Sequence, residues 1–167
     1  MNRVASGRIV RLADNVNTDV ILPGPYLNLT GPSELGEHLL EGYDPDLGAA
    51  IAPGDVLLGG RNFGSGSSRE QAPLAILGRG VQVVIAASFA RIFLRNAINL
   101  GLAAVESPAA WEGLAHGDWV DLDLGVGIIH GPGGQTYAAP TQPEFLGEII
   151  DAGGIIEWTR RRLATRA

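Results

Sequence analysis

The sequence predicts an α/β fold with a parallel β/α centre and short antiparallel strands beside it. Apolar runs of strand length at 55–58, 81–86 and 102–105 are separated by segments with helical spacing. Strands joined by helical crossovers pair in parallel, with right-handed connections. Beyond residue 118 the chain alternates between apolar and polar residues and is broken by glycine-rich turns, which is typical of antiparallel hairpins.

The expected strands are short apolar or alternating runs bounded by turn residues. They are residues 8–12, 55–58, 81–86, 102–105, 119–124, 128–129 and 136–138. The expected helices carry apolar residues three or four positions apart. They are residues 33–40, a segment from the glycine-rich loop to 78–80, residues 89–98, and a last stretch from 143 to 158 that Gly153 and Gly154 interrupt. We expect Ser33 and Ser88 to cap two of these helices, and residues 42–54 to form a loop.

Length and composition limit the class of protein. A chain of 167 residues with 46% hydrophobic content can bury a core, which predicts one compact domain over residues 1–167. The net charge of −6 disfavours nucleic acid as a partner. No apolar run approaches the roughly 20 residues of a membrane span, and no signal peptide is apparent. A cytoplasmic protein without a membrane partner is therefore expected.

Two residue types are missing from the chain. The absence of cysteine excludes thiol nucleophiles, disulfides and the usual ligands of an iron–sulfur cluster. All 12 basic residues are arginine, so lysine Schiff-base chemistry is excluded as well. His116 and His130 have no second ligand at metal-binding spacing. We therefore expect no metal site on this chain.

The stretch from Gly60 to Gln71 connects an apolar strand to a helix and is rich in glycine. Glycines permit positive φ angles and close approach of a ligand, and the first N–H groups of a helix attract anions. The stretch lacks the Gly-Lys-Ser/Thr of a Walker loop, and it carries arginine where the dinucleotide fingerprint needs its third glycine. A different anion site is therefore predicted.

The loop ends in Ser67, Ser68 and Arg69. Arginine binds a carboxylate through two parallel hydrogen bonds, and the serine hydroxyls can donate to a substrate or accept a proton from it. This chemistry favours a small carboxylic acid as the ligand. A purely structural alternative stays open, because Ser67 with Glu70 and Ser68 with Gln71 both fit a capping box.

The wider pattern of the chain resembles the swivelling-domain or small-subunit part of the aconitase superfamily. The resemblance rests on Gly-Arg-Asn-Phe-Gly-Ser-Gly-Ser-Ser-Arg-Glu at 60–70, residues 84–93, Asn96, Asn99-Leu100-Gly101, and a separate block at 17–23. The length and the isolated domain are similar to those of isopropylmalate isomerase small subunits. The resemblance implies a swivelling β/β/α domain, as in the aconitase C-terminal domain.

The resemblance also implies a reaction and an active site that two subunits share. Members of the superfamily move a hydroxyl group between adjacent carbons of a di- or tricarboxylic acid by dehydration and rehydration. By position, Ser67 matches the serine base, Ser68 and Arg69 match the substrate-binding pair, and Gly64 and Gly66 shape the substrate-binding loop. A large subunit would carry the 4Fe-4S cluster, with none bound by this chain. Gln71 departs from many relatives, which have histidine there.

The loop after the block at 17–23 is implied to contact the part of the substrate that differs between relatives. Leu27 and Leu29 in this loop suit a branched alkyl group, and no arginine or lysine lies between Arg11 and Arg61. An extra carboxylate there would lack a cation, which favours isopropylmalate over homocitrate. Homoaconitase and a dimethylmalate-type dehydratase stay open, as does a core-packing role for both leucines.

Other points stay open at the level of sequence. Asp19, Arg91 and Arg95 are not assigned to the active site, and the two arginines are expected to pair with surface acids. Asn15 and Asn17 are expected to cap turns. The assembly with the large subunit is either a heterodimer or a heterotetramer, and the isolated chain could form a homo-oligomer. A noncatalytic carboxylate-binding or regulatory module is the competing class of function.

Overall fold

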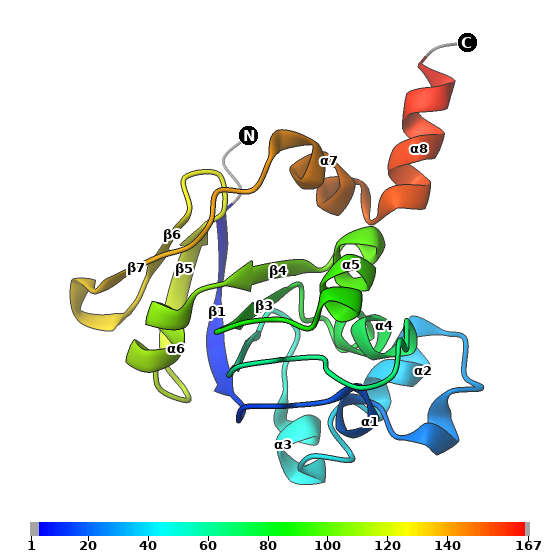
Figure 1. The fold of residues 1–167 in the computed structure, drawn as a ribbon, viewed down its shortest axis with the longest axis horizontal. Helices are drawn as coiled ribbons and strands as arrows, with labels where there is room; N and C mark the ends of the chain where they lie inside the picture. Colours follow the sequence, from blue (N-terminus) through cyan, green and yellow to red (C-terminus); the bar gives the residue numbers. More distant parts are fainter. Residues whose placement is uncertain (1–3, 166–167) are drawn as a thin grey trace.

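The computed structural model describes residues 4–165 and contains a seven-stranded sheet in the order β4-β3-β2-β1-β5-β6-β7 (Figure 1). The strands are β1 Val4–Arg11, β2 Val56–Gly59, β3 Val83–Ala86, β4 Ala103–Glu106, β5 Trp119–Asp123, β6 Ile128–His130 and β7 Thr136–Ala138. The first four strands pair in parallel, and the last three continue the sheet from β1 in antiparallel fashion. The predicted α/β fold class is confirmed.

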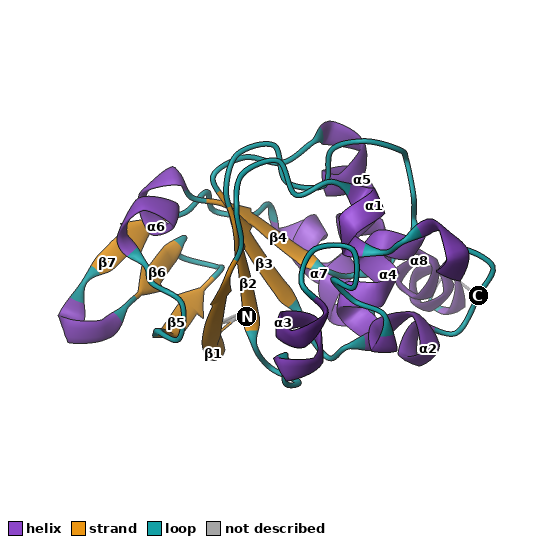
Figure 2. Ribbon diagram, turned by 90° about the horizontal axis from the view of Figure 1, so that it is seen from below, coloured by secondary structure: helices purple, strands orange, loops and turns teal. Residues whose placement is uncertain are grey.

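Eight α-helices and two 3₁₀ turns surround this sheet in the described part of the chain. They are α1 Thr18–Ile21, η1 Gly24–Tyr26, α2 Pro32–Glu37, α3 Pro45–Ala50, α4 Gln71–Gly78, α5 Arg91–Leu100, α6 Pro108–Gly113, η2 Pro132–Gly134, α7 Glu144–Ala152 and α8 Ile155–Ala164. Helices α1, α2, α4 and α5 lie to one side of the parallel strands, whereas α6 lies with β6 and β7 on the other (Figures 1 and 2). Between residues 4 and 165, no helix is both long and apolar enough to cross a membrane.

The parallel centre is built from two strand–helix–strand crossovers, with α4 between β2 and β3 and α5 between β3 and β4. Every residue of β2 and β3 is buried, because helices and the antiparallel strands cover both faces. Two apolar clusters result. The first packs residues of α2, α4 and α5 against the sheet, and the second joins the parallel strands to α6 and β5.

Strand β1 links the two halves of the sheet. Residues 9–11 pair in parallel with β2, whereas residues 4–8 pair antiparallel with β5. Strand β5 buries Val120 and Leu122 and exposes Trp119 and Asp121, as its alternation predicts. The long β1 strand therefore positions the hairpins beside the parallel centre.

Four local expectations from the sequence are wrong. Ser33 does not cap α2, because Pro32 occupies the first helical position and Gly31 precedes it as the cap. The helix ends before Leu39 and Leu40, and Leu40 has a φ of 61°. Residues 42–54 are not a simple loop, because the Asp44 side chain accepts from the Leu47 N–H and begins α3.

The fourth error concerns Ser88. Helix α5 begins at Arg91 with Ala90 as its cap, and the Ser88 hydroxyl oxygen instead accepts from the Asn62 N–H at 2.8 Å. Ser88 thus connects the end of β3 to the glycine-rich loop. The short helix α6 was also not expected, and its cap, Ser107, accepts from the Ala110 N–H.

Candidate functional site

The glycine-rich loop, residues 60–70, lies at the carboxyl ends of the parallel strands, where α/β proteins commonly bind ligands. Figure 2 shows loops running together from one end of these strands toward α1 and α5. The N–H of Gly64 donates to Val16 O at 2.8 Å, and the N–H of Ala90 donates to Phe63 O at 2.9 Å. The glycine-rich loop is therefore held between the segments that follow β1 and β3.

Two glycines in this loop are required by geometry. Gly64 and Gly66 have φ angles of 78° and 91°. A Cβ at Gly64 would overlap the buried Phe93 ring, which packs edge-on against Phe63 with centroids 5.3 Å apart. Phe89 completes this aromatic cluster. The cluster fixes the first half of the loop against α5.

Polar contacts hold the start of the loop to the segment after β1. The Asp14 carboxylate accepts from the Arg61 N–H at 2.7 Å and from its guanidinium at 3.1 Å. The hydrogen bond from the Arg61 backbone is the main reason that the pKa of Asp14 lies below its ordinary value. Asn62 Nδ2 donates to Asn15 Oδ1 at 3.2 Å, and both residues have a φ of 56°. Asn15 therefore stabilises the glycine-rich loop as well as its own turn.

Ser67 and Ser68 are exposed at the end of the loop. Helix α4 begins at Gln71, and its N-cap, Glu70, has helical φ and ψ angles and makes no side-chain cap bond. The capping-box interpretation of the two serines is therefore wrong. The N–H groups of Gly66, Ser67 and Ser68 donate to no acceptor within residues 4–165. These N–H groups and the two serine hydroxyls are therefore available for further hydrogen bonds.

The Thr18 side chain contacts Ser67. Its side chain is buried, and its Oγ1 donates to the Ser67 carbonyl oxygen at 2.9 Å and lies 3.4 Å from Ser67 Oγ. The Thr18 N–H donates to Ser65 O at 2.8 Å, and Asn17 caps α1 by accepting from two backbone N–H groups. Asn17 therefore caps a helix, and its neighbour Thr18 contacts the predicted base.

Arg69 is held by the same short helix. Its Nη2 lies 2.9 Å from Asp19 Oδ1, and its Nη1 donates to Leu22 O at 3.3 Å. The Arg69 side chain is 22% exposed, whereas that of Asp19 is 59% exposed. The Asp19 carboxylate thus restrains the Arg69 guanidinium, which has further N–H donors besides those in these two contacts.

The loop that carries Leu27 and Leu29 is attached to the start of α4. Gln71 Nε2 donates to Leu27 O at 3.4 Å, and both leucines are half-buried against the core. The Tyr26 ring stacks on His38 with centroids 3.6 Å apart, and a hydrogen bond with Glu41 raises the pKa of Tyr26. Both leucines therefore pack on the core while part of each stays accessible.

Arg91 and Arg95 differ from the expectation. Both lie exposed on α5, and neither forms an ion pair with any residue between 4 and 165. The predicted pairing with surface acids is wrong. No acidic residue lies in the first turn of α5 to provide such a partner.

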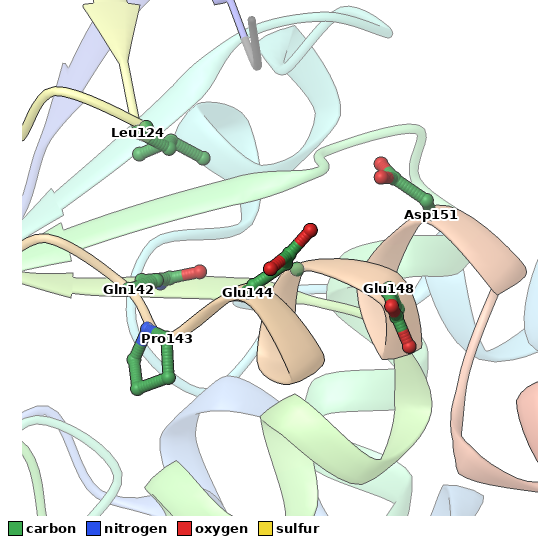
Figure 3. Close-up of a pocket in the computed structure, with 8 residues that line it drawn as sticks. Leu124, Gln142, Pro143, Glu144, Glu148 and Asp151 are labelled. Carbon is green, nitrogen blue, oxygen red and sulfur yellow. The ribbon is translucent and has the colours of Figure 1, made fainter. Parts of the chain in front are cut away.

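A pocket of about 220 Å³ lies between the end of β5 and α7, lined by Leu124, Gln142, Pro143, Glu144, Glu148 and Asp151 among others (Figure 3). None of its lining residues belongs to the glycine-rich loop. Its three acidic side chains disfavour an anionic ligand. The pocket is therefore a poor site for a carboxylic acid.

The donor set of the chain does not fit a metal or an iron–sulfur cluster. The sequence has no cysteine, and no group of three or more His, Asp or Glu side chains in the described region could hold a metal ion. The candidate site instead consists of hydroxyls, backbone N–H groups and one guanidinium. Such a set binds carboxylates and stabilises a negatively charged oxygen.

Comparison with known proteins identifies the class and then the family. Residues 53–110 match the model of the aconitase C-terminal domain, so the fold is that of an aconitase-like domain. The chain belongs to the family of 3-isopropylmalate dehydratase small subunits. It is 45% identical to the protein of that name from Thermodesulfovibrio yellowstonii over 95% of each chain. It is 50% identical to the one from Halothermothrix orenii, over 90% of this chain and 92% of the relative.

Solved structures agree with this assignment. A 3-isopropylmalate dehydratase crystal structure from Methanocaldococcus jannaschii matches with a TM-score of 0.92 and 40% identity, over 98% of each chain. An isopropylmalate/citramalate isomerase small subunit from the same organism is 43% identical over 98% of each chain. Aconitase X of Thermococcus kodakaraensis shares the fold alone, with 15% identity and a TM-score of 0.52 over 83% of this chain and 92% of that chain. The resemblance to the aconitase superfamily is confirmed.

Proposed function

We propose that this chain is the small subunit of a hydro-lyase that interconverts 2-isopropylmalate and 3-isopropylmalate in leucine biosynthesis. The observation that carries the proposal is the Ser67-Ser68-Arg69 triplet, held by Thr18 and Asp19 at the carboxyl ends of the parallel strands. Residues 1–167 would act as one swivelling domain, which the shared seven-stranded sheet supports.

Ser67 is the base in this proposal. Its alkoxide takes the proton from the carbon next to the hydroxyl-bearing carbon, the C–H electron pair forms the double bond, and the hydroxyl group leaves. Hydroxide then adds to the carbon that lost the proton, and Ser67 returns its proton to the carbon that had carried the hydroxyl group, so one hydroxide and one proton are released and taken up. No histidine or lysine is bonded to Ser67 in residues 4–165, so the alkoxide must be stabilised by fixed donors.

The geometry supplies such donors. The Thr18 hydroxyl is 3.4 Å from Ser67 Oγ and carries one hydrogen, which can turn from the Ser67 carbonyl to a charged Oγ. The N–H groups of Gly66 and Ser68 have no acceptor in the described chain. Donors that are already oriented toward a developing charge need little reorganisation during the reaction.

Ser68 and Arg69 bind the substrate carboxylate in this scheme, with Asp19 holding the guanidinium in place. Gly64 and Gly66 let the backbone approach the substrate, and the accessible parts of Leu27 and Leu29 contact the isopropyl group. An apolar contact of this kind distinguishes a branched alkyl group from a carboxylate, because a buried charge without a cation is costly.

The rest of the active site must come from another chain. The family name describes a small subunit, which implies a large-subunit partner. We propose that the large subunit carries the 4Fe-4S cluster and accepts the substrate hydroxyl, because this chain has no ligand set for a cluster. Heterodimer and heterotetramer both satisfy this scheme.

A substrate panel tests the proposed function. The complex of this chain with its large subunit should convert isopropylmalate far better than homocitrate, dimethylmalate or citramalate. Citramalate is included because one relative is named for both substrates. Preference for homocitrate would assign the chain to homoaconitase, and absence of turnover with every acid would favour a noncatalytic module. Tight binding of malate-type acids by the isolated chain would also favour that module.

Substitution of Arg69 by lysine is expected to weaken substrate binding more than catalysis. Lysine keeps the charge but loses the two parallel hydrogen bonds, so we expect KM to rise by about 10- to 100-fold with a smaller fall in kcat. Steady-state kinetics of the complex measures both. Arg160→Lys, an exposed change on α8, serves as the control. An unchanged KM would remove Arg69 from the substrate site.

Substitution of Thr18 by valine tests the donor beneath Ser67. Valine has nearly the same shape but no hydroxyl, and a hydrogen bond to a charged group contributes about 1.5–3 kcal/mol. We expect kcat to fall by about 10- to 100-fold and the rising limb of the pH–rate profile to move to higher pH. Thr18→Ser keeps the hydroxyl, so its kcat and its pH–rate profile should be close to those of the unaltered complex. A normal pH profile in Thr18→Val would mean that the contact only supports the fold.

A further inference from the structure

We propose that the exposed face of α5 formed by Arg91, Ile92 and Arg95 is a docking surface for acidic residues of the large subunit. This inference rests on the proposed function, because it needs a partner chain that covers the active site. It goes further by assigning a surface and a charge to the contact. We call these three residues the α5 face.

The arginines of the α5 face are unusual within this chain. Of the ten arginines in residues 4–165, eight have a partner: Arg8, Arg61, Arg69, Arg160, Arg161 and Arg162 pair with carboxylates, and Arg11 and Arg79 donate to carbonyl oxygens. Arg91 and Arg95 have no hydrogen bond, ion pair or ring contact in that region. The chain carries a net charge of −6, so acids to pair with them are plentiful.

The position of these arginines is locally unfavourable. Arg91 is the first residue of α5, where the positive end of the helix dipole repels a cation. Arg95 follows four positions later, and like charges at this spacing destabilise a helix. Neither residue stabilises its own helix electrostatically. An external anionic partner gives a physical reason for arginine at both positions. Unfavourable local choices of this kind are typical of functional surfaces.

The start of α5 lies beside the glycine-rich loop. The residues just before α5 bond to the glycine-rich loop in both directions: Phe63 N–H donates to Ser88 O at 3.0 Å, and Ala90 N–H donates to Phe63 O at 2.9 Å. Phe93, inside α5, packs against Phe63 and lies where a side chain at Gly64 would point. A protein that covers Ser67 to complete the site therefore comes to lie beside the first turns of α5.

The composition of the face favours a protein over a small acid or a nucleic acid. Ile92 is 52% exposed between the two arginines, and protein interfaces combine an apolar centre with an enrichment in arginine. Arginine is also enriched at interface positions that contribute strongly to binding. The overall negative charge of the chain opposes nucleic acid. The partner surface is therefore expected to present acidic groups around an apolar contact.

Charge reversal on the α5 face tests this inference. The variant is Arg91→Glu with Arg95→Glu, measured as the dissociation constant of the complex with the purified large subunit at low and high salt. Glutamate at the start of a helix is favourable, so the isolated variant should fold with an unchanged or higher Tm. We expect its dissociation constant to rise about tenfold or more and the salt dependence of association to fall. Ile92→Ser should weaken association without altering the salt dependence.

The matched control is Arg160→Glu with Arg162→Glu on α8, which changes the net charge equally and should leave the dissociation constant within about twofold. A dissociation constant that is unchanged in the α5 variant would overturn the inference. So would a raised KM with unaltered association, because the arginines would then serve the substrate. If the unaltered chain does not bind the large subunit, the proposed function fails, and the docking surface fails with it.

Discussion

Replacing Ser67 by alanine should lower the kcat of the assembled enzyme by about 100- to 10,000-fold, the range that a positioned general base contributes. The change removes the proton acceptor and little else, because the Ser67 side chain is exposed and its carbonyl oxygen still accepts from Thr18. The free energy of unfolding and the affinity for the large subunit should therefore be unchanged. Anaerobic kinetics of the reconstituted complex, with thermal unfolding of the isolated chain, measures these quantities.

Ser33→Ala is the matched control for this substitution. Ser33 is also exposed and lies within α2, outside the glycine-rich loop. The control should have normal activity. Near-normal turnover of the Ser67→Ala complex would show that another group takes the proton, and the assignment of the base would be wrong.

Replacing Gly64 by alanine should destabilise the chain by about 2–5 kcal/mol. Alanine at a φ of 78° costs about 1–2 kcal/mol, and overpacking against a buried ring adds about 1–3 kcal/mol. The added methyl group would overlap the near end of the Phe93 side chain, which has little freedom because it is buried against Phe63 and Phe89. Denaturant unfolding of the isolated chain measures the effect, and activity of the complex should fall as well.

Gly117→Ala separates the two causes. Gly117 has a φ of 90°, but a Cβ there meets no atom within 4 Å, so only the conformational cost applies. The free energy of unfolding of the Gly117 variant should fall by about 1–2 kcal/mol, and the variant should remain active. Equal losses in the two variants would mean that Phe93 moves aside freely and that the aromatic cluster does not fix the loop.

The sequence predicted the strands well because their apolar runs are short and bounded by clear turn residues. Strand β5, for example, alternates strictly and has one buried face. Helix starts were predicted less well, because serine is only one of several ways to begin a helix. At α2 a proline sets the start, and at α5 the expected cap, Ser88, is used by the neighbouring loop through Asn62.

The candidate site likewise has one part that the sequence predicts and another that it does not. The glycines and the Ser67-Ser68-Arg69 triplet could be predicted because they are contiguous and their chemistry follows from residue type. The contact of Thr18 with Ser67 joins residues 49 positions apart, so it depends on the pairing of β1 with β2 and has no local signal. The lack of partners for Arg91 and Arg95 likewise depends on where the fold places the acidic side chains of residues 4–165, and it has no local signal.

The central claim is that this chain supplies Ser67 to an active site that a second, cluster-bearing chain completes. It is tested most directly by purifying the tagged chain anaerobically from its native cell and measuring the recovered chains, the iron content and isopropylmalate turnover. We predict a larger iron-containing chain in near-equal amount, and turnover that a Ser67→Ala version of the tagged chain lacks. Recovery of this chain alone and free of iron, under conditions that preserve weak complexes, would contradict it.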